Sequence, residues 1–172
     1  FFILIFGFQA AFASDLLEST IKDGYGIKAL SMGGAFTGYA LGYESSFYNP
    51  AGTAAPGVMY NYENYDFNQN ANSAFDGYSI YLSPFNLTRW RKVNTSNESV
   101  EVNAVSFGKR NRGDINWGVT YKSIQESTAQ TATSTWSADF GVLVHFSPMF
   151  DFGVITQDIL GNNNSLSPSG RT

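Results

Sequence analysis

The sequence predicts an all-β fold, an antiparallel meander that forms part of a transmembrane β-barrel. From Val58 onward, apolar and polar residues alternate with a period of two, the pattern of strands that have two different faces. The clearest runs are about ten residues long with aromatic residues near their ends, the length that a tilted strand needs to cross a bilayer. Aromatic residues make up 16% of the chain while the mean hydropathy is −0.16, as expected if one face is apolar and the other polar.

Three runs show the alternation most clearly, and they cover Asp114–Glu126, Trp136–Ser147 and Phe150–Ile159. Their apolar faces are rich in aromatic residues, and we expect the centre of one such face to contact lipid: Phe140, Val142 and Val144. Their polar faces carry ionisable side chains at mid-strand: Lys122, Asp139 and His145. A water-filled lumen accepts such side chains, whereas a lipid face or the dry core of a soluble β-sandwich, the alternative fold, disfavours them.

Weaker alternation predicts earlier strands at Met59–Phe67, Gly77–Leu82 and Ser99–Gly108. Outer-membrane barrels keep short turns on the periplasmic side and long loops outside. If the tight turns are periplasmic, counting back through six strands places the start of the first strand outside, which conflicts with an N-terminal segment held inside. One more strand within Asn86–Thr95 removes the conflict. That stretch has a poor strand pattern because it contains three basic residues: Arg89, Arg91 and Lys92.

The connections are expected to be of two kinds. Tight turns are predicted at Lys109–Gly113 and Ser147–Met149, and longer loops at Asn68–Asp76 and Ser127–Thr135. Connections of this length join antiparallel neighbours, so the sheet is expected to be a meander.

The stretch Gly24–Gly57 precedes the strands and organises the chain. It is too rich in Gly and Ala to be an ordinary strand, and too apolar to be a solvated linker. Small residues, Gly33 and Gly34 among them, allow close backbone approach, and Pro50 favours an extended conformation at Asn49. We therefore predict a defined turn inside a packed segment; the alternative is a Gly-rich loop followed by one more strand.

Two sequence matches then point to a family. KALSMGGAFTG followed by ESSFYNPAGTA resembles the N-terminal signature of FadL-like outer-membrane proteins, which include the long-chain fatty-acid channels and the PorV/PorQ-type proteins. Lys28 stands where Arg is usual, and only Glu44 remains of an acidic spacer. Downstream, WGVTYKSI and FGVLVHFSPMFDFGVITQDI resemble paired strands of the same family, with Asp158 in place of the usual Asn.

The resemblance implies a barrel of about fourteen strands, of which this chain would hold about seven. It also implies that the segment with Asn49, Pro50 and Ala51 forms a hatch on the lumen side, where it gates ligand passage. Gly33 and Gly34 would belong to the same element.

The chain is expected to divide into three regions. Residues 1–13 read as a secretory leader, truncated at its start, because Phe1–Phe8 is apolar but too short to span a membrane and Ala11–Ala13 has small residues at the cleavage positions. Residues 14–57 form the hatch-like segment, and residues 58–172 form the first part of the barrel.

Several classes of function are disfavoured. A net charge of −4 gives no reason to expect nucleic acid as a partner, and the chain has no Cys for disulfides or thiolate metal sites. No His, Asp and Glu residues have metal-ligand spacing. His145 shares a strand face with Ser137, Asp139 and Ser147, but no nucleophile-elbow motif is present. We therefore expect no catalytic residues, no metal site, no cofactor and no enzymatic activity.

The predicted function is transport of hydrophobic small molecules across a bacterial outer membrane, with outer-membrane lipid as the surrounding partner. Two alternatives stay open. A PorV-like barrel would bind or escort secreted proteins, and a structural outer-membrane protein would carry no selective traffic.

The leader gives a first prediction. Signal-peptide cleavage after Ala13 should leave Ser14 as the N-terminal residue, because small residues precede that bond. Intact-mass spectrometry of the protein purified from membranes measures this directly. Retention of residues 1–13 would contradict export through a cleaved leader.

Overall fold

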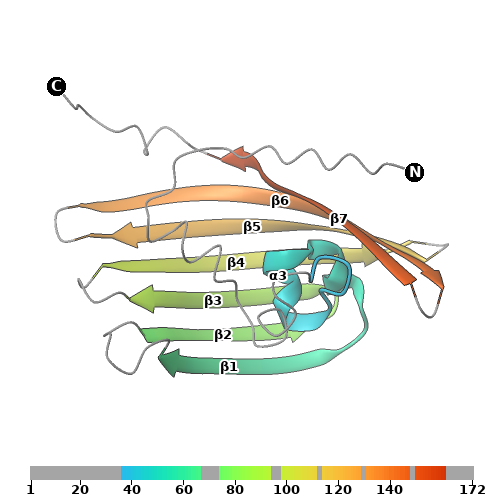
Figure 1. The fold of residues 1–172 in the computed structure, drawn as a ribbon, viewed down its shortest axis with the longest axis horizontal. Coiled ribbons are helices and arrows are strands. Elements are labelled where there is room, and N and C mark those ends of the chain that lie inside the picture. Colours follow the sequence, from blue (N-terminus) through green and yellow to red (C-terminus); the bar gives the residue numbers. More distant parts are fainter. Residues whose placement is uncertain are drawn as a thin grey trace.

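The computed structural model describes residues 36–66, 74–93, 98–111, 114–128, 131–147 and 150–161. It confirms the predicted antiparallel meander, since seven strands pair in sequence order within one sheet (Figure 1). The strands are β1 (Val58–Asp66), β2 (Ala74–Leu82), β3 (Phe85–Val93), β4 (Ser99–Arg110), β5 (Ile115–Ser127), β6 (Ala132–Ser147) and β7 (Phe150–Gly161). The sheet is open rather than closed into a barrel, with β1 and β7 at its two edges.

Among the described residues, three short helical turns precede the sheet: η1 (Gly42–Glu44), α3 (Ser45–Tyr48) and η2 (Pro50–Ala54). No helix among the described residues is long and apolar enough to cross a membrane. The predicted leader, Lys28, Gly33 and Gly34 lie outside the described residues.

The extra strand expected within Asn86–Thr95 is confirmed as β3, although it starts one residue earlier, at Phe85. Its three basic residues are compatible with a strand because they lie on both of its faces. Arg89 and Arg91 are exposed on one face, and Lys92 is buried on the other. The stretch therefore forms a strand although its basic residues interrupt the apolar alternation.

The predicted loops are partly wrong. Ser127–Thr135 was expected to be a loop, but β6 begins at Ala132, and Thr133 and Thr135 pair with Glu126 and Ile124 of β5. β-branched Thr suits a pleated strand, and pairing with β5 outweighs the Ser/Thr content that suggested a loop. Ala74 and Asp76 likewise belong to β2 rather than to the loop predicted at Asn68–Asp76.

The connections alternate between the two ends of the sheet, and short ones occur at both ends, because only residues 128–131 join β5 to β6. Three connections share one end. They join β2 to β3 at Ser83–Pro84, β4 to β5, and β6 to β7. The other connections lie at the opposite end, as Figure 1 shows. We call these the turn end and the loop end.

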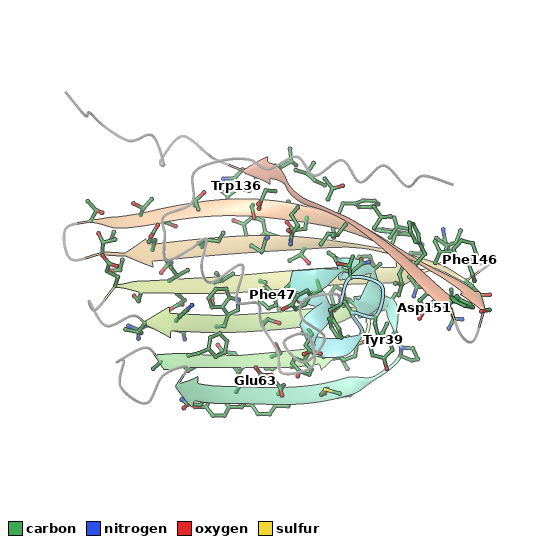
Figure 2. The ribbon with its side chains drawn as sticks, viewed as in Figure 1. Tyr39, Phe47, Glu63, Trp136, Phe146 and Asp151 are labelled. Carbon is green, nitrogen blue, oxygen red and sulfur yellow. The ribbon has the colours of Figure 1, made fainter. Side chains whose placement is uncertain are left out.

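The sheet has two unlike faces. Residues 36–57 pack on one face, here called the inner face, where buried residues alternate with exposed ones along β2, β3 and β4. The opposite, outer face carries large apolar side chains that remain exposed, including Val105, Val119, Tyr121 and Phe140. In Figure 2, Phe47 lies over the middle strands, and Phe146 and Asp151 lie together at the turn end. Leu143, the one apolar residue in the polar alternation of β6, is fully buried on the inner face.

Candidate functional site

The turn predicted around Asn49 and Pro50 is present and packed. Asn49 is extended, with φ −165° and ψ 105°, as a residue before Pro prefers. Its side-chain oxygen accepts a hydrogen bond from the backbone N–H of Ala51 at 3.1 Å, so Asn49 is the N-cap of η2. Asn49, Pro50 and Ala51 are all buried. Within the described residues 42–54 the chain forms η1, α3 and η2, and not the additional strand of the alternative.

The Asn49 side chain also joins three parts of the chain. Its Nδ2 donates to the backbone oxygen of Thr37 at 3.1 Å and to that of Val142 in β6 at 3.0 Å. One amide therefore caps η2, holds the residues before η1 and anchors both to the sheet. Asp would lack the two N–H donors, so this geometry requires an amide.

Three glycines lie beneath η2, and their lack of side chains lets the backbone there approach the sheet closely. Gly108 of β4 pairs with Gly118 of β5, and Gly118 pairs with Gly141 of β6, so the three form one row across the inner face. A Cβ on Gly108 would lie 2.5 Å from the backbone nitrogen of Ala54, and a Cβ on either other glycine would lie closer still to Asn49 or Pro50. We call Gly108, Gly118 and Gly141 the glycine row.

The glycine row was not recognised as a site from the sequence, although a signal exists. Each glycine directly follows an aromatic residue, in Phe107-Gly108, Trp117-Gly118 and Phe140-Gly141. In a strand, such a pair places a large ring on one face and an open backbone on the other. Only the strand register shows that the three glycines lie side by side across the sheet.

A polar row crosses the inner face next to the glycine row. Asn86, Ser106 and Thr120 are register neighbours in β3, β4 and β5, and all are buried. Asn86 Nδ2 donates to Tyr43 O at 2.7 Å and to Ser46 Oγ at 2.8 Å, while the Ser106 hydroxyl bonds to Ser46 Oγ at 2.7 Å. These residues were not singled out as site residues in the sequence, because isolated Ser, Thr and Asn are common on polar faces.

Two of the predicted lumen residues form an ion pair. Lys122 Nζ lies 2.9 Å from Asp139 Oδ2 and 3.6 Å from Asp158 Oδ1. Asp139 also accepts a hydrogen bond from the backbone N–H of Asp158 at 3.0 Å. Asp158 has a φ of 56°, a left-handed conformation that Asp and Asn tolerate better than most residues, and the β6–β7 register shifts at this point. Lys122 and Asp139 therefore hold an irregular part of the sheet together.

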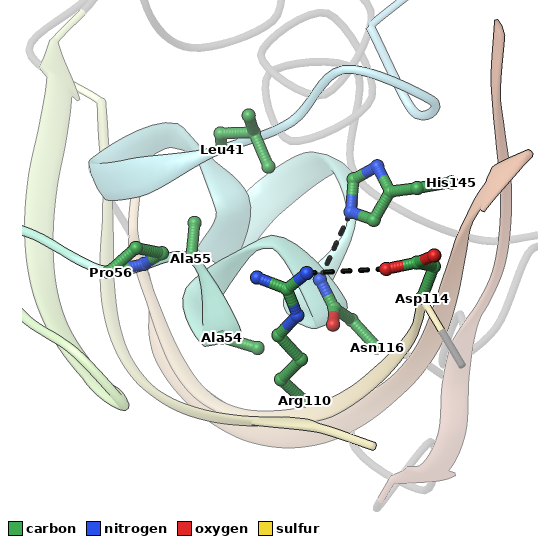
Figure 3. A pocket seen from close by; sticks show the side chains of 8 residues that line it. All are labelled: Leu41, Ala54, Ala55, Pro56, Arg110, Asp114, Asn116 and His145. Carbon is green, nitrogen blue, oxygen red and sulfur yellow. Dashed lines mark hydrogen bonds and ion pairs between the residues drawn. The ribbon is translucent and has the colours of Figure 1, made fainter. Parts of the chain in front are cut away.

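His145, the third predicted lumen residue, lies apart from that pair at the turn end. Its Nδ1 is 2.7 Å from Asp151 Oδ1 and its Nε2 is 3.3 Å from Asn116 Nδ2. The partner carboxylate is thus Asp151, and not Asp139 on its own strand. Figure 3 shows His145 and Asn116 facing a cavity of about 270 Å³ between the sheet and the segment.

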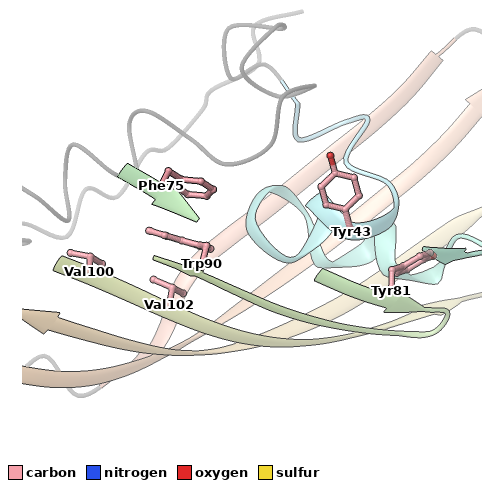
Figure 4. Packing of buried hydrophobic residues seen from close by; sticks show 6 residues of the cluster. All are labelled: Tyr43, Phe75, Tyr81, Trp90, Val100 and Val102. Atoms are coloured by element: carbon pink, nitrogen blue, oxygen red, sulfur yellow. The ribbon is translucent and has the colours of Figure 1, made fainter. Parts of the chain in front are cut away.

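An apolar cluster lies on the inner face beyond η1 and α3 (Figure 4). Its aromatic members include Phe75 and Trp90, whose rings stack 5.9 Å apart, and Phe47 of α3 packs against it. Val100 and Val102 extend it along β4. The inner face is therefore polar near the glycine row and apolar toward the loop end.

The described residues contain no group of His, Cys, Asp and Glu that could hold a metal ion. Comparison of the chain with protein-family models, curated proteins and solved structures finds no match.

The glycine row yields a stability prediction. Gly118→Ala should destabilise the protein by about 1–3 kcal/mol, because its new methyl group meets the backbone of Pro50, which cannot move without shifting η2. Gly38→Ala is the matched control, since its nearest neighbour would be Asp151 O at an ordinary 3.6 Å. Urea unfolding of the whole protein in detergent measures both changes. Equal losses in the two variants would show that the close contact at Gly118 carries no special weight.

Proposed function

We propose that this chain is part of a bacterial outer-membrane β-barrel whose N-terminal segment acts as a hatch for hydrophobic small molecules. The observation that carries the proposal is the polarity of the sheet. Large apolar side chains are exposed on the outer face, while buried Ser, Thr and Asn line the inner face. A soluble β-sandwich has the opposite arrangement, with apolar residues between its sheets, and soluble proteins rarely expose broad apolar patches.

The outer apolar residues form a continuous band with aromatic borders. On its turn-end side, Phe85, Phe107 and Trp117 pack in sequence, with ring centroids 5.3 Å and 6.0 Å apart. On its loop-end side, Tyr121 stacks on Trp136 at 6.1 Å. Aromatic girdles at both interfaces are typical of transmembrane barrels.

The height of the band fits a membrane. On β6 the outward residues from Trp136 to Val144 are all apolar. At ~3.4 Å per residue they extend about 27 Å along the strand, and Phe146 lengthens the run. With a tilt of ~40°, this corresponds to about 21 Å across the membrane, close to the ~25 Å band of outer-membrane barrels.

Polar residues begin on the outer face at the loop-end border. The row that contains Trp136 also contains Arg89, Asn103 and Ser123, and the next row contains Arg91, Glu101 and Gln125. Arg89 forms an ion pair with Glu101 at 2.9 Å. An abrupt change from apolar to charged residues along the same strands marks the level at which lipid would give way to water.

The inner face supports the hatch. Asn49 and the glycine row hold η2 against the sheet through hydrogen bonds and close backbone contact, with no covalent link. The apolar cluster around Phe75 and Trp90 is buried, and Tyr43 of η1 and Phe47 of α3 pack in or against it. A hydrophobic passenger would reach this cluster only when the segment moved, which is the action that the hatch proposal requires.

A PorV-like role in binding secreted proteins is the second candidate. It is favoured by a polar cleft of about 510 Å³ at the loop end, lined by residues that include Arg91, Glu101 and Gln125. Such a cleft outside the apolar band is accessible to a protein partner.

The membrane location is tested by arginine scanning along one face. Phe140→Arg places a charge in the middle of the band and should cost about 2–4 kcal/mol of folding free energy in lipid. Ser134→Arg, on the same strand and face but beyond Trp136, should cost about 0–1 kcal/mol. Urea titration of the whole protein in liposomes, followed by heat-modifiable gel migration, measures both. Similar small effects would indicate that water surrounds the band.

Transport is tested with the whole protein in proteoliposomes. The wild type should pass a long-chain fatty acid while excluding sucrose. Asn49→Leu should admit sucrose, because it removes the hydrogen bonds to Thr37 and Val142 that hold the segment. Asn64→Leu, at an exposed position of β1, is the matched control and should stay closed. A wild-type protein that passes no fatty acid but retains secreted proteins in pull-down would favour the PorV-like role.

A further inference from the structure

The cleft of about 510 Å³ at the loop end lies on the outer face of the sheet, next to the apolar band. Most of its lining side chains come from two adjacent rows that the strand register places across β3 to β6. The first row contains Arg91, Glu101, Gln125 and Ser134, and the second includes Ser99 and Ser127. Because only Ser and Ala occupy the second row from β4 to β6, the longer side chains of the first row border an open space.

The cleft offers hydrogen-bonding groups that the protein itself does not use. Among the described residues, neither the Arg91 guanidinium nor the Gln125 amide has a hydrogen-bond partner, and both side chains are exposed. Glu101 is held in place, because its carboxylate accepts hydrogen bonds from Asn103 Nδ2 at 3.0 Å and Arg89 Nη2 at 2.9 Å. Each carboxylate oxygen can accept a further hydrogen bond. Donors and acceptors that a ligand can reach therefore lie side by side.

The mixture of these groups indicates a ligand with many hydroxyl groups. Charged side chains of both signs line the cleft, since Arg91 lies beside Glu101 and Glu126, and Asp76 is the other register neighbour of Arg91. Charge therefore selects neither an anion nor a cation. The serine hydroxyls and the Gln125 amide both donate and accept hydrogen bonds, as the hydroxyl groups of a sugar do. The volume also lies within the ~300–1,000 Å³ of small-molecule sites.

The position of the cleft indicates how such a sugar is presented. Ser134 in the cleft and Trp136 at the border of the band are neighbouring outward residues of β6, about 7 Å apart along the strand. The band continues from Trp136 through Phe140 and Val142 toward the turn end. A molecule with an apolar tail can therefore lie along the band while its polar head occupies the cleft. A glycolipid has these two parts in this order.

We propose that the cleft binds the sugar headgroup of a membrane glycolipid whose acyl chains lie along the apolar band. This inference rests on the proposed membrane location, because only a surrounding bilayer brings acyl chains to that face. It does not depend on the hatch or on transport. A bound headgroup would also occupy the surface that a PorV-like role offers to a protein partner.

The test places the whole protein in nanodiscs that contain equal amounts of diglucosyl diacylglycerol and phosphatidylcholine with the same acyl chains. Native mass spectrometry then identifies the lipid that stays bound when the disc is removed. The wild type should retain the glycolipid about fivefold or more over phosphatidylcholine. Arg91→Ala and Gln125→Ala should each reduce this preference about two- to tenfold, the effect of losing one hydrogen bond. Ser134→Leu should abolish it, because the larger side chain fills the cleft.

Asn64→Ala is the matched control. Asn64 lies on β1 in the same row as Arg91, with Asp76 between them, but it does not line the cleft. It therefore shares the depth of Arg91 along the sheet, and its substitution should leave the lipid preference unchanged. A loss in Asn64→Ala as large as that in Arg91→Ala would overturn the proposal, because the whole row rather than the cleft would then set the preference.

The remaining outcomes separate this inference from the proposed function. A wild type that enters the nanodiscs but retains both lipids equally would overturn the glycolipid site and leave the membrane location intact. Failure of the wild type to enter bilayers of any composition would overturn both. Binding of free maltose, followed by protein-observed NMR, without a preference between the two lipids would identify a soluble saccharide as the occupant and would likewise overturn the proposal.

Discussion

The arrangement of the inner face depends on one close contact, that of the Asn49–Ala54 backbone with the glycine row. A side chain at Gly108, Gly118 or Gly141 would lift η2 away from the sheet. The hydrogen bonds from Asn49 to Val142 and from Asn86 to Ser46 would then lose their geometry, because each spans only about 3 Å. The buried amides and hydroxyls can therefore form these hydrogen bonds only because the Asn49–Ala54 backbone lies so close to the sheet.

This arrangement also explains why the interior of the sheet can be polar. Ser79, Thr88, Ser106 and Thr120 are buried, and each lies within hydrogen-bonding distance of another hydroxyl or amide. Buried polar groups are tolerated when they are paired, and a paired network fixes a unique docking position for the segment. The large apolar residues of the outer face remain exposed, while a smaller apolar cluster around Phe75 and Trp90 is buried on the inner face.

The sequence could predict features that repeat along the chain. Alternation located most of the strands, and the parity of turns and loops located β3, whose basic residues obscured it. The turn at Asn49 and Pro50 was also predictable, because Pro limits its neighbour. The glycine row was not predictable, since its members lie in three different strands and only the register aligns them. The same holds for the pairing of His145 with Asp151, which depends on how β7 folds back on β6.

The unpaired backbone groups of the two edge strands limit the environments in which this sheet can be stable. β1 has 9 residues and β7 has 12, and along an edge strand about half the residues direct both N–H and C=O outward. About twenty backbone groups are therefore left unpaired, and in hydrocarbon each would cost several kcal/mol. The sum is tens of kcal/mol, beyond the ~5–15 kcal/mol of a whole domain. If lipid covers the outer face, additional strands must therefore pair with β1 and β7, because the sheet leaves both of these edges open.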